Sequence, residues 1–386
     1  MAKQNKPAIR FKGFTDAWEQ RKAKELCNIG TGKSNTQDQV EDGIYPFYIR
    51  SDIPVKSNKY LYDCEAVITI GDGNIGRVFH YVNGKFDLHQ RCYKMTDFQD
   101  IWGKYFYYFF STRFYDRAMK MTAKATVDSV RLEMISEMDI WKPTAIDEQK
   151  KIAEFFANLD HLITLHQRKY DKLQVLKKAM LEKMFPKNGS SVPEIRFKGF
   201  TDAWEQRKVG EVANVYDGVH QTPNYTDSGI MFLSVENIGT LKSEKYISEE
   251  AFNHDYKVYP QKGDILMTRI GDVGTPNVVE TSEKIAFYVS LALLKPCNVD
   301  SYFLCNSILS PFFQRGLKER TLITAIPQKI NKDEIGKVDL VLPASTDEQQ
   351  VIGAFFQQLD NLITLHQREL EKLKNLKKAC LEKMFV

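Results

Sequence analysis

Hydrophobic residues recur in steps of three and four along two stretches of the chain, residues 147–185 and 347–385. The apolar positions of the first stretch are Ile152, Phe155, Phe156, Leu159, Leu162, Ile163, Leu173, Leu176, Met180 and Met184. This spacing places them on one face of an amphipathic helix, and neither stretch contains a proline. Each stretch is therefore predicted to form one helix of roughly 58 Å. Thr346 and Gln349 have the spacing of a capping box at the start of the second.

The two stretches are copies of each other, with 26 of 39 positions identical in an alignment without gaps. A second duplicated block, IRFKGFTDAWEQRK, occupies residues 9–22 and again residues 195–208. The inserts between the blocks, residues 23–146 and 209–346, share almost nothing. The chain thus repeats a frame and varies its inserts. This pattern indicates that the frame performs one task twice, whereas each insert performs a task of its own.

One amphipathic helix of this length cannot bury its apolar face alone, but two matching helices can bury each other's. We expect an antiparallel pair with a pseudo-twofold arrangement, the alternative being that each helix packs along its own domain. The predicted fold class is α/β (α+β), with two globular domains separated by the two long helices. The predicted domains are 1–146 and 187–346, with helices at 147–186 and 347–386. The polar segment 186–191 is predicted to serve as an exposed linker.

Both inserts have the pattern of mixed α/β domains with short strands. Strands are predicted at 66–70, 77–81, 229–235, 264–269 and 339–342, and helices at 104–121 and 302–316. The segments ITIGDGNIG (68–76) and MTRIGDVG (267–274) each run from a strand into a glycine-bearing turn with an aspartate. Such a turn either brings backbone close to a phosphate or base edge, or is a tight hairpin.

Composition narrows the class of protein only moderately. The net charge of +4 and the pI of about 8.5 are mildly basic, so charge alone does not indicate nucleic-acid binding. The six cysteines form no C-x-x-C pair, no N-terminal apolar run resembles a signal peptide, and no stretch approaches the length of a membrane span. We therefore expect a reduced, soluble, cytoplasmic protein.

Polar clusters in the predicted loops of both inserts are candidates for contacts with DNA bases. Arginine commonly pairs with guanine, and asparagine or glutamine with adenine. Each cluster alone is more typical of a solvated loop, but the presence of such clusters in both inserts supports the group, although it singles out no member. The predicted DNA-binding residues are Lys33, Ser34, Asn35, Asn74, His89, Gln90, Arg91, His220, Gln221, Thr222, Arg269, Asp272, Thr324, Gln328 and Lys329.

No catalytic signature is complete in this sequence. The segment IGTGKS ends like a phosphate-binding loop, but Cys27 stands where its first glycine belongs. The segment Thr222-Pro223-Asn224-Tyr225 has the wrong order for an adenine methyltransferase site. We predict no catalytic residue, no metal site and no cofactor bound by this chain. His166 and His366 are predicted to be core or interface residues rather than metal ligands. The rival interpretation is a stand-alone enzyme of another type.

The whole layout resembles the specificity subunits of type I restriction–modification systems. The resemblance covers essentially the entire chain. It rests on the duplicated DEQ-x-x-I-x-x-FF-x-x-LD-x-LITLHQR block with Pro143 or Pro343 before it, on GDILMTRIGDVG from Gly263, and on GVHQTPNYTDSGIMFLSVENI over 218–238. In the first insert ITIGDGNIG departs from the family pattern, which has an arginine or serine at the strand end.

The resemblance implies a non-catalytic subunit in which each insert recognises one half of a bipartite, asymmetric DNA site. The helices of such proteins set the spacer and dock two methyltransferase subunits, and motor/nuclease subunits join for cleavage of phage DNA. The assembled complex would be an adenine methyltransferase and ATP-dependent endonuclease, with S-adenosylmethionine, ATP and Mg on the partner subunits. The helix residues expected to bind partners are Phe155, Phe156, Leu162, Phe355, Phe356 and Leu362. The alternative function is a protein-binding scaffold.

Overall fold

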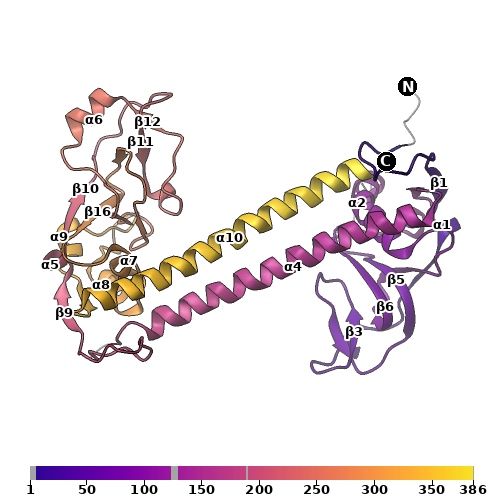
Figure 1. The fold of residues 1–386 in the computed structure, drawn as a ribbon. Coiled ribbons are helices and arrows are strands. Elements are labelled where there is room, and N and C mark those ends of the chain that lie inside the picture. Colours follow the sequence, from indigo (N-terminus) through magenta and orange to yellow (C-terminus); the bar gives the residue numbers. More distant parts are fainter. Residues whose placement is uncertain (1–5, 123–128, 188–189, 386) are drawn as a thin grey trace. The chain divides into compact units, whose positions relative to one another are not determined.

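A computed structural model of the chain describes residues 6–122, 129–187 and 190–385. The chain divides into two compact units, which we call unit 1 (residues 1–167 and 368–386) and unit 2 (residues 168–367). Each unit combines one insert, one copy of the short duplicated block and parts of both long helices, α4 (Ile146–Lys183) and α10 (Thr346–Met384) (Figure 1). The two long helices are therefore shared between the units.

Unit 1 is built on a six-stranded sheet with the order β2-β7-β5-β6-β3-β4. Its strands are β2 (Asn28–Thr31), β3 (Tyr45–Tyr48), β4 (Val55–Ser57), β5 (Tyr62–Ile70), β6 (Phe79–Leu88) and β7 (Cys92–Thr96). All neighbours are antiparallel except β3 and β6. Helix α2 (Gly103–Thr122) contributes stacked, buried aromatic rings to the core, among them Phe106, Phe110 and Phe114. The shorter elements are α1 (Ala23–Leu26), η1 (Thr36–Asp38) and α3 (Leu132–Ser136).

Unit 2 distributes its strands over a four-stranded sheet, β10-β16-β13-β14, and a three-stranded sheet, β12-β11-β15. The strands are β10 (Ala213–Asp217), β11 (Ile230–Leu233), β12 (Tyr246–Ile247), β13 (Ile265–Thr268), β14 (Pro276–Val278), β15 (Ile285–Phe287) and β16 (Leu291–Pro296). The helices are α5 (Val209–Val212), η2 (Val235–Asn237), α6 (Glu249–Asp255), α7 (Ser301–Leu309), α8 (Pro311–Arg320) and α9 (Lys332–Gly336). Two apolar clusters fill its interior, one of them beneath α7 and α8.

The short duplicated block closes each unit in the same way. Its last residues pair with the strand that precedes the long helix, β1 (Glu19–Lys22) with β8 (Asp139–Lys142) and β9 (Glu205–Lys208) with β17 (Asp339–Leu342). The guanidinium of Arg10 donates to both carboxylate oxygens of Glu148 at 2.6 and 2.7 Å, and Arg196 donates to Glu348 at 2.6 and 2.8 Å. Both carboxylates are 1% exposed, so these bidentate pairs bury the start of each long helix against its frame.

Within each unit the two long helices are antiparallel. In unit 1, Phe385 after the end of α10 stacks on Phe156 near the start of α4, at 5.6 Å between ring centroids. In unit 2, Phe185 after the end of α4 packs on Phe303 and Phe356. Both phenylalanines are almost fully buried, at 4% exposure or less. The duplicated helix thus completes the core of each unit, which confirms the antiparallel pair predicted from the repeat.

Two local expectations need correction. The predicted helix at 302–316 is two helices, because Ser310 caps the start of α8 and Pro311 has no N–H to continue α7. The side chain of Gln349 does not close a capping box, since it binds the N–H of Asp300 and the carbonyl of Pro343. Instead, Ser345 Oγ accepts from the N–H of Glu348 at 3.4 Å.

The remaining expectations concern the linker and membranes. The predicted linker 186–191 includes residues 188–189, which lie outside the described residues. In the described part of the chain, none of the helices combines the length and apolar character that crossing a membrane requires.

Candidate nucleic-acid interface

Four loops of unit 1 come together at one end of its sheet. Backbone hydrogen bonds join them: the N–H of Ser34 donates to Leu88, Gln90 to Ser34, His89 to Tyr48, and Gly71 to Arg91, at 2.7 to 3.1 Å. We call the loops 31–36, 49–50, 71–74 and 89–91 the recognition edge of unit 1. This edge brings together two polar clusters and the glycine-bearing turn, which the sequence singled out separately.

Unit 2 has the same backbone pattern at the corresponding end of its strands. The N–H of Val219 donates to Phe287, Val289 to Val219, Tyr288 to Leu233, and Arg269 to Ser290, at 2.8 to 3.2 Å. Isolated parallel bridges join Ser34 to His89 in unit 1 and Val219 to Tyr288 in unit 2. We call loops 218–222, 234–235, 269–272 and 288–290 the recognition edge of unit 2. Two inserts with almost no sequence in common therefore carry equivalent edges.

The glycine-bearing turns predicted to be related are indeed equivalent, with a register that the hydrogen bonds define. Gly73 and Gly271 have φ of 84° and 82°, and Gly76 and Gly274 have φ of 69° and 95°. Positive φ strains any residue with a β-carbon, which explains why glycine stands at these four positions. In this register Gly71 occupies the place of Arg269, because the N–H of each donates to the equivalent carbonyl.

The predicted contact residues of unit 1 fall into two groups. Lys33, Asn74, Gln90 and Arg91 are exposed on the recognition edge, and Asn35 is half-buried there.

Ser34 and His89 are 2% and 5% exposed and act inside the protein. The Ser34 hydroxyl donates to Asp87 at 2.7 Å, and His89 Nδ1 accepts from the N–H of Arg91 at 3.1 Å. Burial, followed by the charge of Arg50, lowers the pKa of His89, so the imidazole is neutral at pH 7. These two side chains support the edge and expose almost no surface to a ligand.

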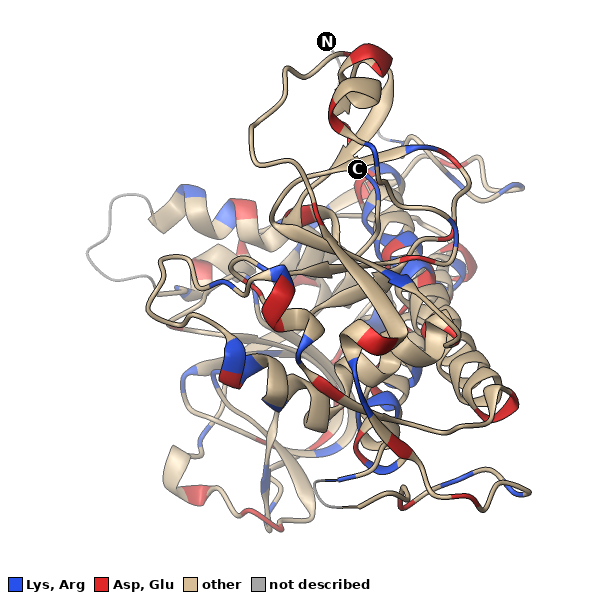
Figure 2. Cartoon of the chain, turned by 90° about the vertical axis from the view of Figure 1, so that its left-hand side faces the viewer, with Lys and Arg blue, Asp and Glu red and all other residues tan. Residues whose placement is uncertain are grey.

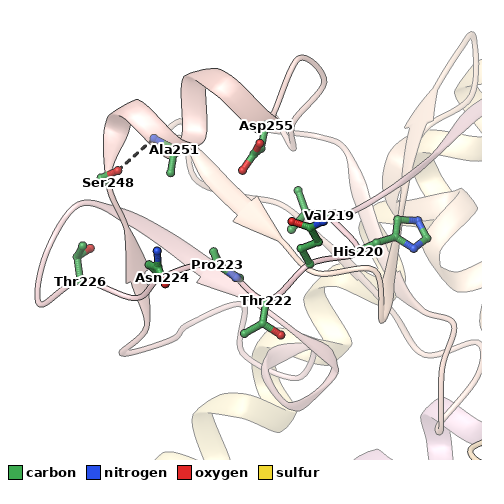
Figure 3. A pocket seen from close by; sticks show the side chains of 10 residues that line it. Val219, His220, Thr222, Pro223, Asn224, Thr226, Ser248, Ala251 and Asp255 are labelled. Atoms are coloured by element: carbon green, nitrogen blue, oxygen red, sulfur yellow. Dashed lines mark hydrogen bonds between the residues drawn. The ribbon is translucent and has the colours of Figure 1, made fainter.

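In unit 2, the exposed residues His220, Gln221 and Thr222 line a hollow of about 610 Å³ between the 219–226 loop and α6. Figure 3 shows this hollow, with Ser248 accepting from the N–H of Ala251 at the start of α6. The ring of His220 points away from these α6 residues in this view. Exposed amide, hydroxyl and imidazole groups of this kind can exchange hydrogen bonds with base edges.

Arg269 differs from the sequence expectation in its surroundings. Its side chain is 6% exposed, pairs with Asp217, and donates from Nε to the carbonyl of Ile330 at 3.0 Å. Burial lowers the pKa of this guanidinium. Because its side chain is buried and bonded to internal partners, Arg269 ties the strand end to the 329–330 segment rather than facing a ligand.

The other predicted residues of unit 2 are exposed. They are Asp272, which accepts from the Thr275 hydroxyl at 2.6 Å, and Thr324, Gln328 and Lys329 on the loop that pairs with Ile270.

Sequence reasoning missed Arg50 and Asp72. Arg50 follows β3 in a segment without a motif, and only the tertiary structure brings it to Asp72, 22 positions later. No local pattern in the sequence could have found this pair, because their contact depends on how β3 and β5 are placed in the sheet.

Both signs of charge occur across the chain. In the view of Figure 2, lysine and arginine are interspersed with aspartate and glutamate. The described residues contain no group of three or more His, Cys, Asp or Glu that could hold a metal ion. Because the two signs of charge are mixed, contacts with base edges, rather than bulk electrostatics, must supply the base discrimination of any nucleic-acid interface here.

The predicted partner-binding residues differ strongly in exposure. Phe156 and Phe356 are fully buried, and Phe155 and Phe355 are partly buried against the two cores. Leu162 and Leu362 are 39% and 46% exposed. The structure adds two further pairs of exposed leucines at duplicated positions, Leu165 with Leu365 and Leu176 with Leu376. Exposed apolar residues at matching positions of both helices are typical of a surface that is used twice.

A duplicated frame that presents two equivalent edges with unlike side chains defines a two-domain recognition protein. A family model described as the type I restriction modification DNA specificity domain matches residues 15–175 and again residues 201–375. These matches cover most of the chain, which therefore belongs to this family.

Two characterised relatives cover nearly the full chain. The type I restriction enzyme MjaVIII specificity subunit of Methanocaldococcus jannaschii is 24% identical over 367 residues, which is 88% of this chain and 85% of the relative. The type I restriction enzyme EcoDI specificity subunit of Escherichia coli is 19% identical over 412 residues, which is 95% of this chain and 88% of the relative.

Solved structures share the fold. The S subunit of the type I restriction–modification system from M. genitalium superimposes with a TM-score of 0.70 at 16% identity, covering 99% of both chains. A chain from a study of complex assembly and conformational transition of the type I R-M system has a TM-score of 0.50 at 16% identity, covering 95% of this chain and 97% of that one.

Proposed function

We propose that this chain is the DNA sequence-recognition subunit of a type I restriction–modification complex, and that each unit recognises one half of a bipartite, asymmetric site. The observation that carries the proposal is the pair of recognition edges. They share one backbone hydrogen-bond pattern and differ in the side chains they expose. A shared scaffold with unlike side chains suits two domains that dock on the same kind of ligand and select different sequences on it.

The contacts are assigned to the exposed members of the two edges and the adjacent loop. In unit 1 these are Lys33, Asn35, Asn74, Gln90 and Arg91. In unit 2 they are His220, Gln221, Thr222, Asp272, Thr324, Gln328 and Lys329. Ser34, His89 and Arg269 are left as supporting residues because their side chains are buried. The recognition domains correspond to residues 1–146 and 187–346.

The duplicated helices, at 147–186 and 347–386, are proposed to dock two methyltransferase subunits and to set the gap between the half-sites. Leu162 and Leu362 are the predicted residues best exposed for this role, and Leu165, Leu365, Leu176 and Leu376 extend it. Phe155, Phe156, Phe355 and Phe356 support the helix starts from inside. The subunit has no catalytic role; S-adenosylmethionine, ATP and Mg belong to the partner subunits, and the complex acts on cytoplasmic DNA.

The test is an exchange of inserts, with the modified adenines mapped in DNA methylated by the assembled complex. Replacing residues 23–146 with the insert of another family member should change one half-site and leave the other half-site and the gap unchanged. The matched exchange of residues 209–346 should change only the other half. If both halves changed together, the division of labour between the units would be wrong. If neither changed and a gel shift detected no duplex binding at low salt, the chain would be a protein-binding scaffold.

A further inference from the structure

The recognition edge of unit 1 contains one compact cluster of charged side chains, Arg50, Asp72 and Arg91. Arg91 Nη1 donates to Asp72 Oδ2 at 2.8 Å, and Arg50 Nη1 lies 3.2 Å from both oxygens of the same carboxylate. The Asp72 side chain is 17% exposed, whereas those of Arg50 and Arg91 are 47% and 62% exposed. The carboxylate is thus the covered member, and the two guanidinium groups are the accessible ones.

The backbone around Asp72 is fixed on both sides. The N–H of Gly71 donates to the carbonyl of Arg91 at 2.7 Å, and Asp72 itself forms an antiparallel bridge with Ser129. Three separate segments therefore meet at this carboxylate. A rigid acceptor between two long, flexible side chains reduces the number of orientations that each guanidinium can adopt.

The charges of the cluster persist at neutral pH. Burial alone would raise the pKa of Asp72, but the hydrogen bonds from Arg91 and Arg50 outweigh it and the pKa is lowered. Among the described residues, Asp72 is the only hydrogen-bond acceptor for either guanidinium, so both keep unused N–H groups. A hollow of about 330 Å³, lined by Thr36, Ile49, Arg50, Asp72, Gly73 and His89, lies beside them.

We propose that Arg50 and Arg91 contact guanine in the half-site of unit 1, and that Asp72 is the positioning residue that orients both. This inference rests on the proposed function. A phosphate contact needs only positive charge, which a neighbouring carboxylate would weaken. A guanine contact needs two parallel N–H groups aimed at O6 and N7, and an oriented guanidinium supplies them.

The equivalent positions of unit 2 explain why this contact belongs to one half-site only. The backbone pattern places Val235, Ile270 and Ser290 where unit 1 has Arg50, Asp72 and Arg91. The hydroxyl of Ser290 accepts from the N–H of Val235 at 3.0 Å, so the same site is filled by a neutral hydrogen bond. One scaffold thus carries a charged cluster in unit 1 and an uncharged one in unit 2.

The experiment uses the full chain assembled with its methyltransferase subunits, and the readout is the base preference at each position of the mapped site. The insert exchange described above identifies the half-site of unit 1, which should contain guanine. Arg91→Ala should lower the preference for guanine at one position by about tenfold or more and leave the half-site of unit 2 unchanged. Arg50→Ala should act on the same or the adjacent base. The control is Arg21→Ala, which removes an exposed arginine paired with Glu25 in the frame.

Two variants separate this idea from simpler ones. Arg91→Lys keeps the charge but not the two parallel donors, so it should lose the guanine preference as Arg91→Ala does. If Arg91→Ala weakened binding to all sequences equally, the residue would contact phosphate and the proposal would fail. If Arg91→Lys kept the wild-type preference for guanine, two parallel donors oriented by Asp72 would not be required, and the proposal would fail as well. Asp72→Asn should partly reduce the preference for guanine at the same position. It should cause no further change in a chain in which both arginines are already alanine.

Failure here is distinguishable from failure of the proposed function. If the insert exchange changes one half-site but that half contains no guanine, or if these variants leave every base preference intact, the arginine pair is not a recognition device. If the insert exchange changes nothing, the assignment of the units to half-sites is itself wrong.

Discussion

Lys377 in the last part of α10 donates a hydrogen bond to Asp160 of α4 within unit 1. In unit 2, Lys177 of α4 donates in the same way to Asp360 of α10. Each residue lies 200 positions from its counterpart, so the two pairs are copies of one interaction. Asp160 also accepts from the hydroxyl of Tyr108 at 2.8 Å, which ties α10, α4 and α2 together. The duplication therefore reproduces individual contacts as well as helices.

Reversing the charge of Lys377 should loosen this contact. Lys377→Glu places two carboxylates side by side, and we expect a loss of about 1 kcal/mol in the free energy of unfolding, since Asp160 is 37% exposed and partly screened. Urea unfolding at low and high salt measures it, and the loss should shrink as salt rises. Lys372→Glu is the control on the same helix, because Lys372 is 76% exposed and its Nζ lies as far as 3.9 Å from Glu369 Oε1, which makes this ion pair a weak one. Equal effects from both variants would show that Asp160 and Lys377 do not interact in solution.

The bidentate pair of Arg10 and Glu148 should contribute much more to stability. Glu148→Gln leaves a guanidinium that is 13% exposed without its counter-charge, and we expect a loss of about 3 kcal/mol in unit 1. Trp204 is the single tryptophan of unit 2 and donates to Glu348 at 3.3 Å, so hydrogen exchange of its indole N–H reports on that unit separately. Hydrogen exchange should increase in unit 1 while Trp204 stays unperturbed.

The matched variant Glu348→Gln should produce the reverse pattern, with faster hydrogen exchange in unit 2 and at the Trp204 indole and no change in unit 1. Glu25→Gln, which removes a 40% exposed carboxylate paired with Arg21, should change neither unit. A uniform loosening of both units by Glu148→Gln would contradict the assignment of this pair to unit 1.

Gly32 is a glycine because of a close backbone approach at the recognition edge. A β-carbon there would lie 2.2 Å from the carbonyl oxygen of Leu88 and 2.4 Å from that of His89, whereas one at Gly30 would meet nothing within 4 Å. Gly32→Ala should therefore displace the loop that carries Lys33 and Asn35, destabilise unit 1 by about 2 kcal/mol, and impair recognition of its half-site.

Gly30→Ala, in the preceding strand β2, is the control and should be tolerated. Gly218→Ala is the counterpart in unit 2, where a β-carbon would lie 2.5 Å from the carbonyl oxygen of Phe287. It should impair the other half-site. Adenine mapping in DNA methylated by each variant complex, together with thermal unfolding, tests both. Normal recognition by Gly32→Ala would show that the loop does not depend on this approach.

The sequence by itself determined those parts of this protein that depend on neighbouring residues in the chain or that occur as duplicated segments. The 3.6-residue periodicity and the identical blocks define two long helices and their frame, and matched apolar faces require a matched partner. The same duplication points to the family, because the residues of its motif occur in both copies of the long block. Predicted strands such as 66–70 and 264–269 correspond to parts of β5 and to β13 for the same reason, since alternation and turn residues are local signals.

Only the tertiary structure decided what the unlike inserts share and which side chains face outward. Ser34, His89 and Arg269 look like surface contacts in the sequence, yet each is buried. Ser34 and Arg269 bind partners that lie 53 and 61 positions away in the chain. Strand pairing and register decide that Gly71 is equivalent to Arg269. They also decide that Arg50 and Arg91 meet at Asp72. Strand pairing joins residues far apart in sequence, so no pattern along the chain encodes it, whereas a helix is encoded by its own neighbours.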